Sequence, residues 1–550
     1  MTTHRGHELS DFAVDKRMIL VAALALPVGA FGALAAWALL RLIGLATNLF
    51  FYGRISTSLI AVGGGHPWWQ VLLLPVAGGL VIGLMARFGS EKIRGHGMPE
   101  AIESILIGGS RVDPKVAVLK PISAAISIGS GGPFGAEGPI IMTGGAIGSI
   151  LAQHLHLTAD ERKTLLVAGA ASGMAATFNS PLAAILLAVE LLLFEWRPRS
   201  FIPVAAGVAV STVVRSVILG SAPIFPVATT GLHLTPGIEA LAAVVGLSGA
   251  IVAAGATWLV YRAEDAFSRL PIHWMWWPAI GGLIIGAGGL IEPRALGVGY
   301  DVIDQLLTGQ ATTGLIVGIL VVKTLIWSLS LGSGTSGGVL APIFMIGGAL
   351  GAAAGLVLPS VIPGFWALLG LTAVVGGVMR SPLTGVVFTL ELTHAWAVAL
   401  PLLITSVVAY GASVLLLRRS VLTEKIARRG LHLTRDYTTD PLETFFCEDI
   451  MRAPAVQLPE GAPVLHPRDT VRHAAYVLAR SGAQDAAVMD DAGAYLGLIG
   501  PADLLVARLH DLTEATDRDR TLRYLTRRSR PAAPARLHAR VGSSSPSAPR

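Results

Sequence analysis

The chain carries two glycine-rich breaks inside apolar sequence, and the breaks lie 203 residues apart. Residues 129–139 read Gly-Ser-Gly-Gly-Pro-Phe-Gly-Ala-Glu-Gly-Pro, and residues 332–342 read Gly-Ser-Gly-Thr-Ser-Gly-Gly-Val-Leu-Ala-Pro. A duplicated membrane unit whose helices are interrupted at corresponding places is typical of transporters that form an ion site from broken helices near the bilayer midplane. The pattern therefore predicts a membrane bundle with an internal repeat.

Other residues recur with nearly the same spacing. A lysine precedes each break, a Ser-Pro-Leu sequence follows it, and an acid lies further along the chain. The matching pairs are Lys120 and Lys323, Ser180 and Ser381, and Glu190 and Glu391. We therefore predict two inverted repeats, at about residues 70–219 and 277–417.

The composition is that of a membrane protein. Hydrophobic residues make up 53% of the chain, charged residues make up 14%, and the mean hydropathy is +0.65. Soluble domains carry far more charge. Between positions 306 and 417, the only Asp, Glu, Lys or Arg residues are Lys323, Arg380 and Glu391. Several helices there can cross hydrocarbon without exposing a charge.

The apolar segments have uneven lengths. The polar residues 1–17 are predicted to form a cytoplasmic N-terminus, and residues 18 to about 42 a retained first span without a signal-peptide cleavage pattern. Later segments such as 140–154 and 382–393 are shorter than the roughly 20 residues of a perpendicular span. Such segments indicate half-spanning helices whose ends meet inside the protein. We thus predict an all-α polytopic membrane domain over residues 18–435.

The two breaks suit the binding of an anion. A helix N-terminus presents unpaired N–H groups and a partial positive charge of roughly half an elementary charge. Each break is predicted to be a loop that leads into a new helix, and Pro139 or Pro342 lies in the first turn of that helix. Two such termini facing one another would form a desolvated anion cage. Amide dipoles, unlike fixed lysine charges, would also let the ion leave again.

Three short motifs occur in order, at residues 95–99, 135–139 and 338–342. They have the forms Gly-x-Gly-x-Pro, Gly-x-Glu-x-Pro and Gly-x-Leu-x-Pro. With the two Ser-Pro-Leu elements, they resemble the signatures of the CLC family of chloride channels and H+/Cl- exchangers, over about residues 15–435. The resemblance implies a homodimer in a lipid bilayer, a bacterial plasma membrane, with one anion pathway per subunit and both termini in the cytoplasm. It implies no cofactor or metal.

The resemblance identifies Glu137 as the outer gating glutamate. Its carboxylate would occupy an anion site when ionised and leave that site when protonated. An ionisable side chain at membrane depth is costly unless it has a function. The alternative is a carboxylate that only caps a helix N-terminus. The anion-binding residues implied by the resemblance are His96, Gly97, Gly135, Ala136, Glu137, Gly138, Val339, Leu340 and Leu422.

Some of these positions depart from the family pattern. His96 replaces the inner-gate serine, and it contacts either the anion directly or only backbone and water. Leu340 stands where the family has phenylalanine, and Leu422 where it has an anion-coordinating tyrosine. The backbone amides of Val339 and Leu340 survive these changes, but a hydroxyl contact from each side does not. We therefore expect weaker occupancy of the central site.

The proton pathway of the family also departs here. Glu190 matches the first acid of the exchanger pair, whereas Leu191 stands where the inner proton-transfer glutamate is expected. An apolar side chain cannot carry protons, so we predict a channel-like protein with weak or absent proton coupling. An H+/Cl- antiporter remains the alternative. We interpret Glu190 and Glu391 as structural acids.

A small second domain follows the membrane block. Residues 445–510 predict a β–α–β–β–α order, which resembles one cytoplasmic CBS motif. Asp503 is a candidate ribose ligand for an adenine nucleotide, with a helix-capping role as the alternative. Residues 511–550 are basic and rich in Ser, Pro and Ala, and predict a disordered tail.

Other functional classes find less support. No His-x-x-Glu-His motif occurs, so the chain is not predicted to be an enzyme. The single cysteine, Cys447, leaves no thiol cluster for a metal. The net charge of +6 is concentrated in arginines after the last apolar segment and in the tail, and needs no nucleic acid to explain it. A sodium-coupled solute transporter and a carrier of fluoride or nitrate stay open as alternatives.

Overall fold

The computed structural model describes residues 17–106, 109–430, 442, 445–454, 461–506 and 509. The chain divides into two compact units, Met1–Arg435 and Asp436–Arg550. The predicted cytoplasmic N-terminus, apart from Arg17, and the predicted tail at 511–550 lie outside the described residues.

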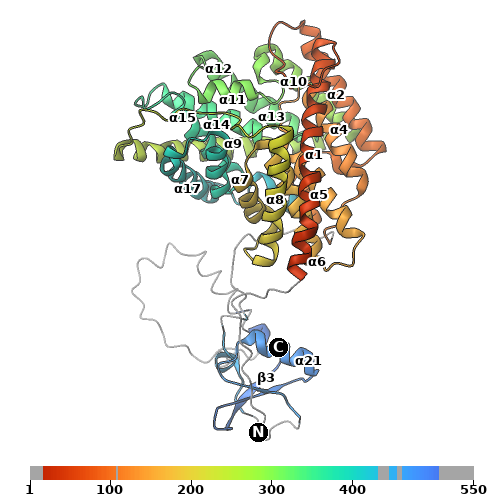
Figure 1. Ribbon diagram of the computed structural model, residues 1–550, viewed down its shortest axis with the longest axis vertical. Coiled ribbons are helices and arrows are strands. Elements are labelled where there is room, and N and C mark those ends of the chain that lie inside the picture. The colour runs from red at the N-terminus through yellow and green to blue at the C-terminus, as the bar shows by residue number, and fades with distance from the viewer. Residues whose placement is uncertain are drawn as a thin grey trace, which may run out of the picture. The chain divides into compact units, whose positions relative to one another are not determined.

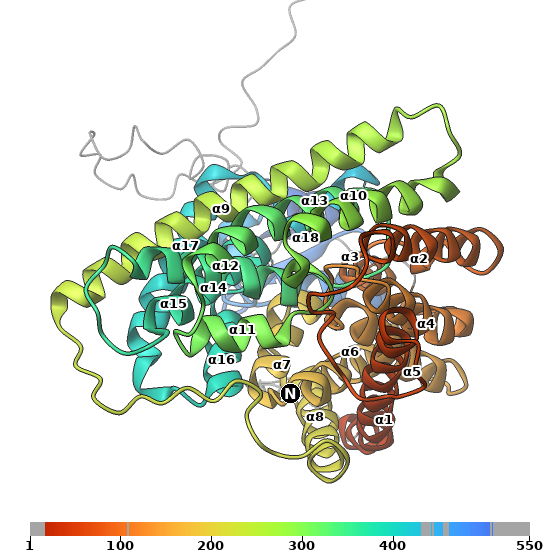
Figure 2. The same ribbon diagram turned by 90° about the horizontal axis from the view of Figure 1, so that it is seen from above.

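The first unit is helical and has two halves, which lie side by side in Figure 2. The helices of the first half are α1 (Arg17–Tyr52), α2 (Trp68–Phe88), η1 (Glu91–Ile93), α3 (Met98–Leu106), α4 (Pro114–Gly129), α5 (Glu137–Gln153), α6 (Ala159–Phe178), α7 (Pro181–Leu187), η2 (Ala188–Leu193) and α8 (Pro198–Ile218).

The second half repeats this succession of long and short helices. It contains α9 (Pro236–Ser268), η3 (Trp274–Trp276), α10 (Trp277–Ile291), η4 (Pro293–Ala295), α11 (Tyr300–Leu307), α12 (Thr313–Gly318), η5 (Ile319–Lys323), α13 (Thr324–Gly332), α14 (Leu340–Gly355), α15 (Phe365–Met379), α16 (Pro382–Thr393), η6 (Trp396–Val398), α17 (Ala399–Leu416) and α18 (Val421–Arg428). Helix α10 packs against α2, and α8 packs against α1, with both labelled near the middle of the bundle in Figure 1.

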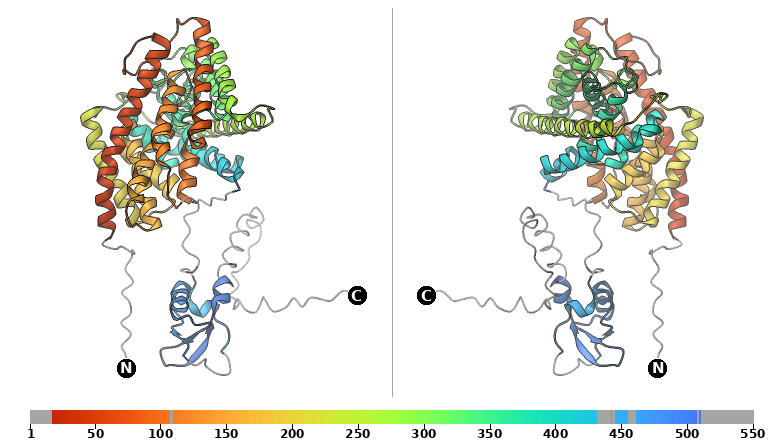
Figure 3. Two further views of the ribbon diagram at one scale, coloured as in Figure 1. Left: turned by 90° about the vertical axis from the view of Figure 1, so that its right-hand side faces the viewer. Right: turned by 90° about the vertical axis from the view of Figure 1, so that its left-hand side faces the viewer.

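Within the described residues, seven helices are long and apolar enough to cross a membrane. The long helix α9 has 33 residues, more than the roughly 20 of a perpendicular span, and Figure 3 shows it lying crosswise to α1. Helices α5 and α14 have 17 and 16 residues and are buried along most of their length. Short helices therefore end inside the protein, as the sequence predicted, and the membrane fold is confirmed.

The repeat is visible in two equivalent turns. Asn179 and Arg380 both end a helix in the left-handed region, with φ of 55° and 56°. A Ser-Pro pair then starts the next helix, and proline fits there because the first helical N–H has no partner within the helix.

Two acids join the halves reciprocally. Glu190 accepts hydrogen bonds from the N–H groups of Leu383 (3.3 Å) and Thr384 (3.0 Å) at the start of α16. Glu391 accepts them from Leu182 (3.0 Å) and Ala183 (2.8 Å) at the start of α7. Each carboxylate thus caps a helix of the opposite repeat, where the unpaired amides favour negative charge.

The second unit is a small α/β structure. It contains α20 (Cys447–Ile450), β1 (Val464–Leu465), α21 (Val471–Ser481), β2 (Ala486–Met489) and β3 (Tyr495–Ile499). Strand β2 lies in the middle of the sheet, parallel to β1 and antiparallel to β3. Residues 501–506 are helical, so the described part has the predicted β–α–β–β–α order.

Candidate anion site

The three glycine motifs converge inside the first unit. Gly338 and Gly135 exchange backbone hydrogen bonds, the Gly338 N–H donating at 2.8 Å and the Gly135 N–H at 3.4 Å. The Gly95 N–H donates to the carbonyl of Thr335 (3.2 Å), and the Gly337 N–H donates to the carbonyl of Gly95 (3.5 Å). The loops that start α3, α5 and α14 are therefore joined, and the N-termini of three helices meet.

Glycine is required at this crossing. A Cβ on Gly138 would collide with the carbonyl oxygen of His96, and one on Gly97 with the carbonyl of Gly138. Gly97 also has a φ of +87°, a backbone conformation that favours glycine. The predicted anion-binding residues Gly97, Gly135 and Gly138 thus lie together.

The carboxylate of Glu137 occupies the helix N-terminus that faces it. The side chain is fully buried, and its Oε1 accepts a hydrogen bond from the N–H of Leu340, the first residue of α14. A negative group therefore lies at amides of opposite partial charge. Ala136 directly precedes Glu137 and α5, and its side chain is also buried.

The two repeated lysines hold the loops of this region. Lys120 Nζ donates to the carbonyls of Ile93 (2.7 Å) and Gly95 (2.8 Å). Lys323 Nζ donates to the carbonyls of Ala295 and Gly297, both at 2.8 Å. Both ammonium groups are fully buried, and they bind backbone oxygens rather than the glutamate. The repeated lysines therefore position the loops.

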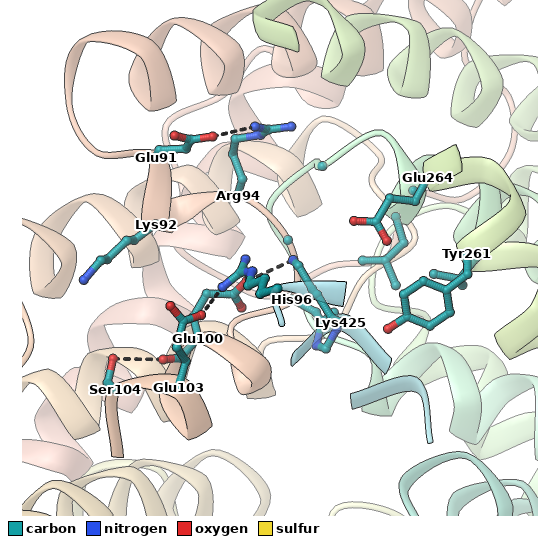
Figure 4. Close-up of a pocket in the computed structure, with 16 residues that line it drawn as sticks. Glu91, Lys92, Arg94, His96, Glu100, Glu103, Ser104, Tyr261, Glu264 and Lys425 are labelled. Carbon is teal, nitrogen blue, oxygen red and sulfur yellow. Dashed lines mark hydrogen bonds and ion pairs between the residues drawn. The ribbon is translucent and has the colours of Figure 1, made fainter. Parts of the chain in front are cut away.

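A cavity of about 420 Å³ lies beside the Gly95–His96 segment. Figure 4 shows His96 and Lys425 near its middle, with Tyr261 and Glu264 on one side and Glu91 and Lys92 on the other. His96 is 4% exposed, and its Nδ1 has no hydrogen-bond partner in the described part of the chain. Burial, together with the nearby cations, lowers the pKa of His96 to about 3, so the ring is neutral near pH 7.

Glu100 forms an ion cluster at the edge of this cavity. Its Oε1 lies 2.9 Å from Lys425 Nζ and 3.2 Å from Arg429. Its Oε2 accepts the N–H of Gly97 at 3.0 Å. Although burial opposes it, the charge of Lys425 lowers the pKa of Glu100, which therefore stays ionised. The cluster ties α18 to the start of α3, next to His96.

The two hydroxyls of the family pattern, from serine and tyrosine, are replaced here by His96 and Leu422, and Leu340 replaces the phenylalanine. Leu340 and Leu422 are buried, with exposures of 2% and 0%. Tyr261 is nearby on α9, but its hydroxyl donates to the carbonyl of Val421. Leu191 is also fully buried, in the π-helical segment η2, and offers no titratable group. Glu190 binds the start of α16, as described above.

Asp503 is engaged within the second unit. Its Oδ2 lies 2.9 Å from Arg452 Nε and accepts the Gly500 N–H at 2.7 Å. The carboxylate is 2% exposed, so it caps a helix and pairs with arginine instead of facing a ligand. Asp503 thus has the contacts of the capping alternative in this structure, and the ribose contact stays a prediction.

The sequence reasoning missed several residues of the site. Glu100 directly follows the first motif, and this adjacency was an available signal. Lys425 and Arg429 lie more than 300 residues away in the chain, and the sequence alone gave no indication that they pair with Glu100. Among the described residues, no group of three His, Cys, Asp or Glu could hold a metal.

The chain is similar to several known proteins. A family model described as voltage gated chloride channel matches residues 78–414. The H(+)/Cl(-) exchange transporter ClcA of Citrobacter koseri is 31% identical over 421 residues, covering 71% of this chain and 85% of that protein. A solved slow cyanobacterial Cl-/H+ antiporter is 23% identical, covers 76% of this chain and 99% of its own, and has a TM-score of 0.64. A eukaryotic CLC transporter is 17% identical, with 88% and 98% coverage and a TM-score of 0.61. Both structures share the fold of this chain.

Proposed function

The chain belongs to the voltage-gated chloride channel family and transports chloride, and we propose that Glu137 gates its anion pathway. The observation that carries the proposal is the buried carboxylate of Glu137 on the N-terminal amide of Leu340. Chloride needs the same amides, so the two anions compete for one site. Protonation removes the negative charge of the side chain and with it the competitor.

Chloride would then be held by backbone dipoles. The amides at the starts of α3, α5 and α14 supply partial positive charge, whereas Lys120 and Lys323 are committed to loop carbonyls. Binding by dipoles favours release and therefore passage. His96 and Leu422 add no hydroxyl, so we propose that the site between the helix N-termini holds chloride weakly.

Proton coupling is proposed to be weak. Leu191 cannot bind a proton, and His96 is kept neutral by burial and by the cations around it. Neither residue thus offers an inner proton relay. The second candidate is H+/Cl- exchange, and it is favoured by the similarity to the H(+)/Cl(-) exchange transporter ClcA of Citrobacter koseri. In that case, water would have to carry protons past Leu191.

Reconstituted vesicles separate these two modes. Under a chloride gradient, we expect chloride flux without sodium and little uphill proton movement, because neither Leu191 nor the neutral His96 supplies an inner proton donor. Proton uptake and reversal potentials would be measured in graded chloride and pH gradients, with fluoride and nitrate as competing anions. Sustained uphill pumping that Glu137→Gln abolishes would establish the exchanger instead. Flux that requires sodium and a solute would contradict both modes.

The second unit is proposed to modulate transport as a CBS-like domain within a homodimer. Each chain supplies one such motif, so two subunits could complete a pair across the dimer axis. Removing the residues after Arg435, the end of the first unit, should leave a dimer that still passes chloride, because the described anion site lies wholly before that point. Light scattering would report the dimer and vesicle efflux the flux. A monodisperse truncated dimer without any flux would refute this role.

A further inference from the structure

A second cavity, of about 450 Å³, lies between α9 and the segment that joins α17 to α18. Four arginines line it, namely Arg262 on α9, Arg418 and Arg419 in the joining segment, and Arg428 on α18. Its two acids are Asp265 and Glu424. Four positive and two negative charges leave an excess of two positive charges, which favours an anionic ligand.

The acids are already paired with two of the arginines. Arg428 lies 2.5 Å from Asp265 and 3.3 Å from Glu424, and Arg419 lies 3.4 Å from Glu424. Arg262 and Arg418 have no ion pair within the described residues. The guanidinium of Arg262 instead lies 5.5 Å from the ring centroid of Trp258. The excess charge of the cavity is therefore carried by Arg262 and Arg418.

Apolar side chains line part of the cavity, among them Leu417, and exposed leucines precede Leu417 in the chain. Trp258 is 57% exposed and lines the cavity, and Leu415 and Leu416, at the end of α17, are 89% and 56% exposed. Exposed aliphatic side chains at the end of a span are suited to lipid chains, and tryptophan is enriched at the headgroup level. A basic pocket thus adjoins an apolar surface at the end of the last spanning helix.

We propose that this cavity binds the phosphate of an anionic phospholipid. The guanidinium groups of Arg262 and Arg418 hold the phosphate, and the acyl chains lie along Trp258 and the end of α17. Arginine suits the phosphate because its planar donors can form two parallel hydrogen bonds with it. Basic pockets between spanning helices are a recurrent form of lipid headgroup recognition. A free phosphate ion would offer the charge but would leave the apolar surface uncovered.

The bound lipid would also steady α18. Tyr261 lines both this cavity and the cavity beside His96, and its hydroxyl donates to the carbonyl of Val421 at the start of α18. The guanidinium of Arg428 lies 4.6 Å from the Tyr261 ring centroid. The lipid pocket therefore shares α18 with the ion cluster of Glu100 and Lys425, although lipid binding does not depend on the proposed gate.

Native mass spectrometry of the delipidated full chain tests the proposal. Phosphatidylglycerol and phosphatidylcholine would be titrated into the protein, its Arg262→Gln/Arg418→Gln variant and an Arg111→Gln/Arg468→Gln control. The control removes two exposed arginines that do not line the cavity. We expect the wild type and the control to prefer phosphatidylglycerol. The Arg262→Gln/Arg418→Gln variant should bind it at least about tenfold more weakly, because two charge-assisted contacts are lost.

Three results would overturn the proposal. One is equal binding of phosphatidylglycerol by the cavity variant and the wild type, and another is no preference over phosphatidylcholine in the wild type. The third is inorganic phosphate at low millimolar concentration displacing the lipid or matching its affinity, because the site would then hold a free anion. Circular dichroism and chloride flux of the cavity variant would verify that it is folded. Weaker lipid binding by a folded variant can then be assigned to the lost arginines.

Discussion

Glu137→Gln is expected to raise chloride flux at neutral pH and to remove the dependence of that flux on pH. The neutral amide has nearly the shape of the carboxylate but loses the charge that competes for the Leu340 amide. A hydrogen bond to a charged group contributes about 1.5–3 kcal/mol. Losing this hydrogen bond should lower the occupancy of the anion site by the side chain about tenfold or more, since each 1.4 kcal/mol corresponds to a factor of about ten. Chloride efflux from vesicles would measure the change. A range of roughly pH 4.5 to 8 covers the protonation of a carboxyl group.

The chloride flux of the wild-type protein should depend on pH in one direction. Acid protonates Glu137 and removes the competitor, so wild-type flux should rise as the pH falls, towards the level of the variant. Glu448→Gln is the matched control, because Glu448 is exposed in the second unit. The chloride flux of this control variant should depend on pH as the flux of the wild type does. If Glu137→Gln retains the full acid activation of the wild type, Glu137 is not the gate.

Much of the membrane fold could be predicted because apolar runs and Gly or Pro breaks mark where helices start and stop. The ends of some helices were wrong. Helix α1 continues to Tyr52, beyond the expected end near residue 42, and includes the buried polar residue Asn48. The Asn48 amide donates to the carbonyls of Gly44 and Ser58, both at 2.8 Å. Backbone partners of this kind, in the preceding turn and in the following loop, allow polar residues inside a helix, and apolarity alone does not reveal them.

The site could be predicted only where its chemistry is local. Glu137 was found because a carboxylate and its helix start are adjacent in one motif. The amide it binds, Leu340, was reached through the repeat, which relates positions 203 residues apart. No repeat links Glu100 to Lys425 and Arg429, so the ion cluster could not be inferred. The reciprocal capping by Glu190 and Glu391 likewise depends on how the halves pack.

Lys120→Met and Lys323→Met should each destabilise the protein strongly. Each substitution leaves two buried carbonyls without a donor, those of Ile93 and Gly95 or those of Ala295 and Gly297. A buried group that loses its partner costs about 1–3 kcal/mol, and relief from burying the ammonium group offsets part of this. We expect a net loss on the order of 2–4 kcal/mol in each variant, seen as lower melting temperatures and aggregation in size-exclusion chromatography.

The two lysine variants should differ in their effect on chloride flux. Lys120 holds the loop that leads to His96 and α3, so its loss should reduce chloride flux in whatever folded protein remains. Lys323 holds the equivalent loop before α11, outside the cavity of His96, so flux per folded protein should fall less. Lys115→Met is the control, because Lys115 is exposed on the same helix as Lys120. Melting temperatures for both buried-lysine variants equal to that of the control would show that the loop carbonyls do not need these donors.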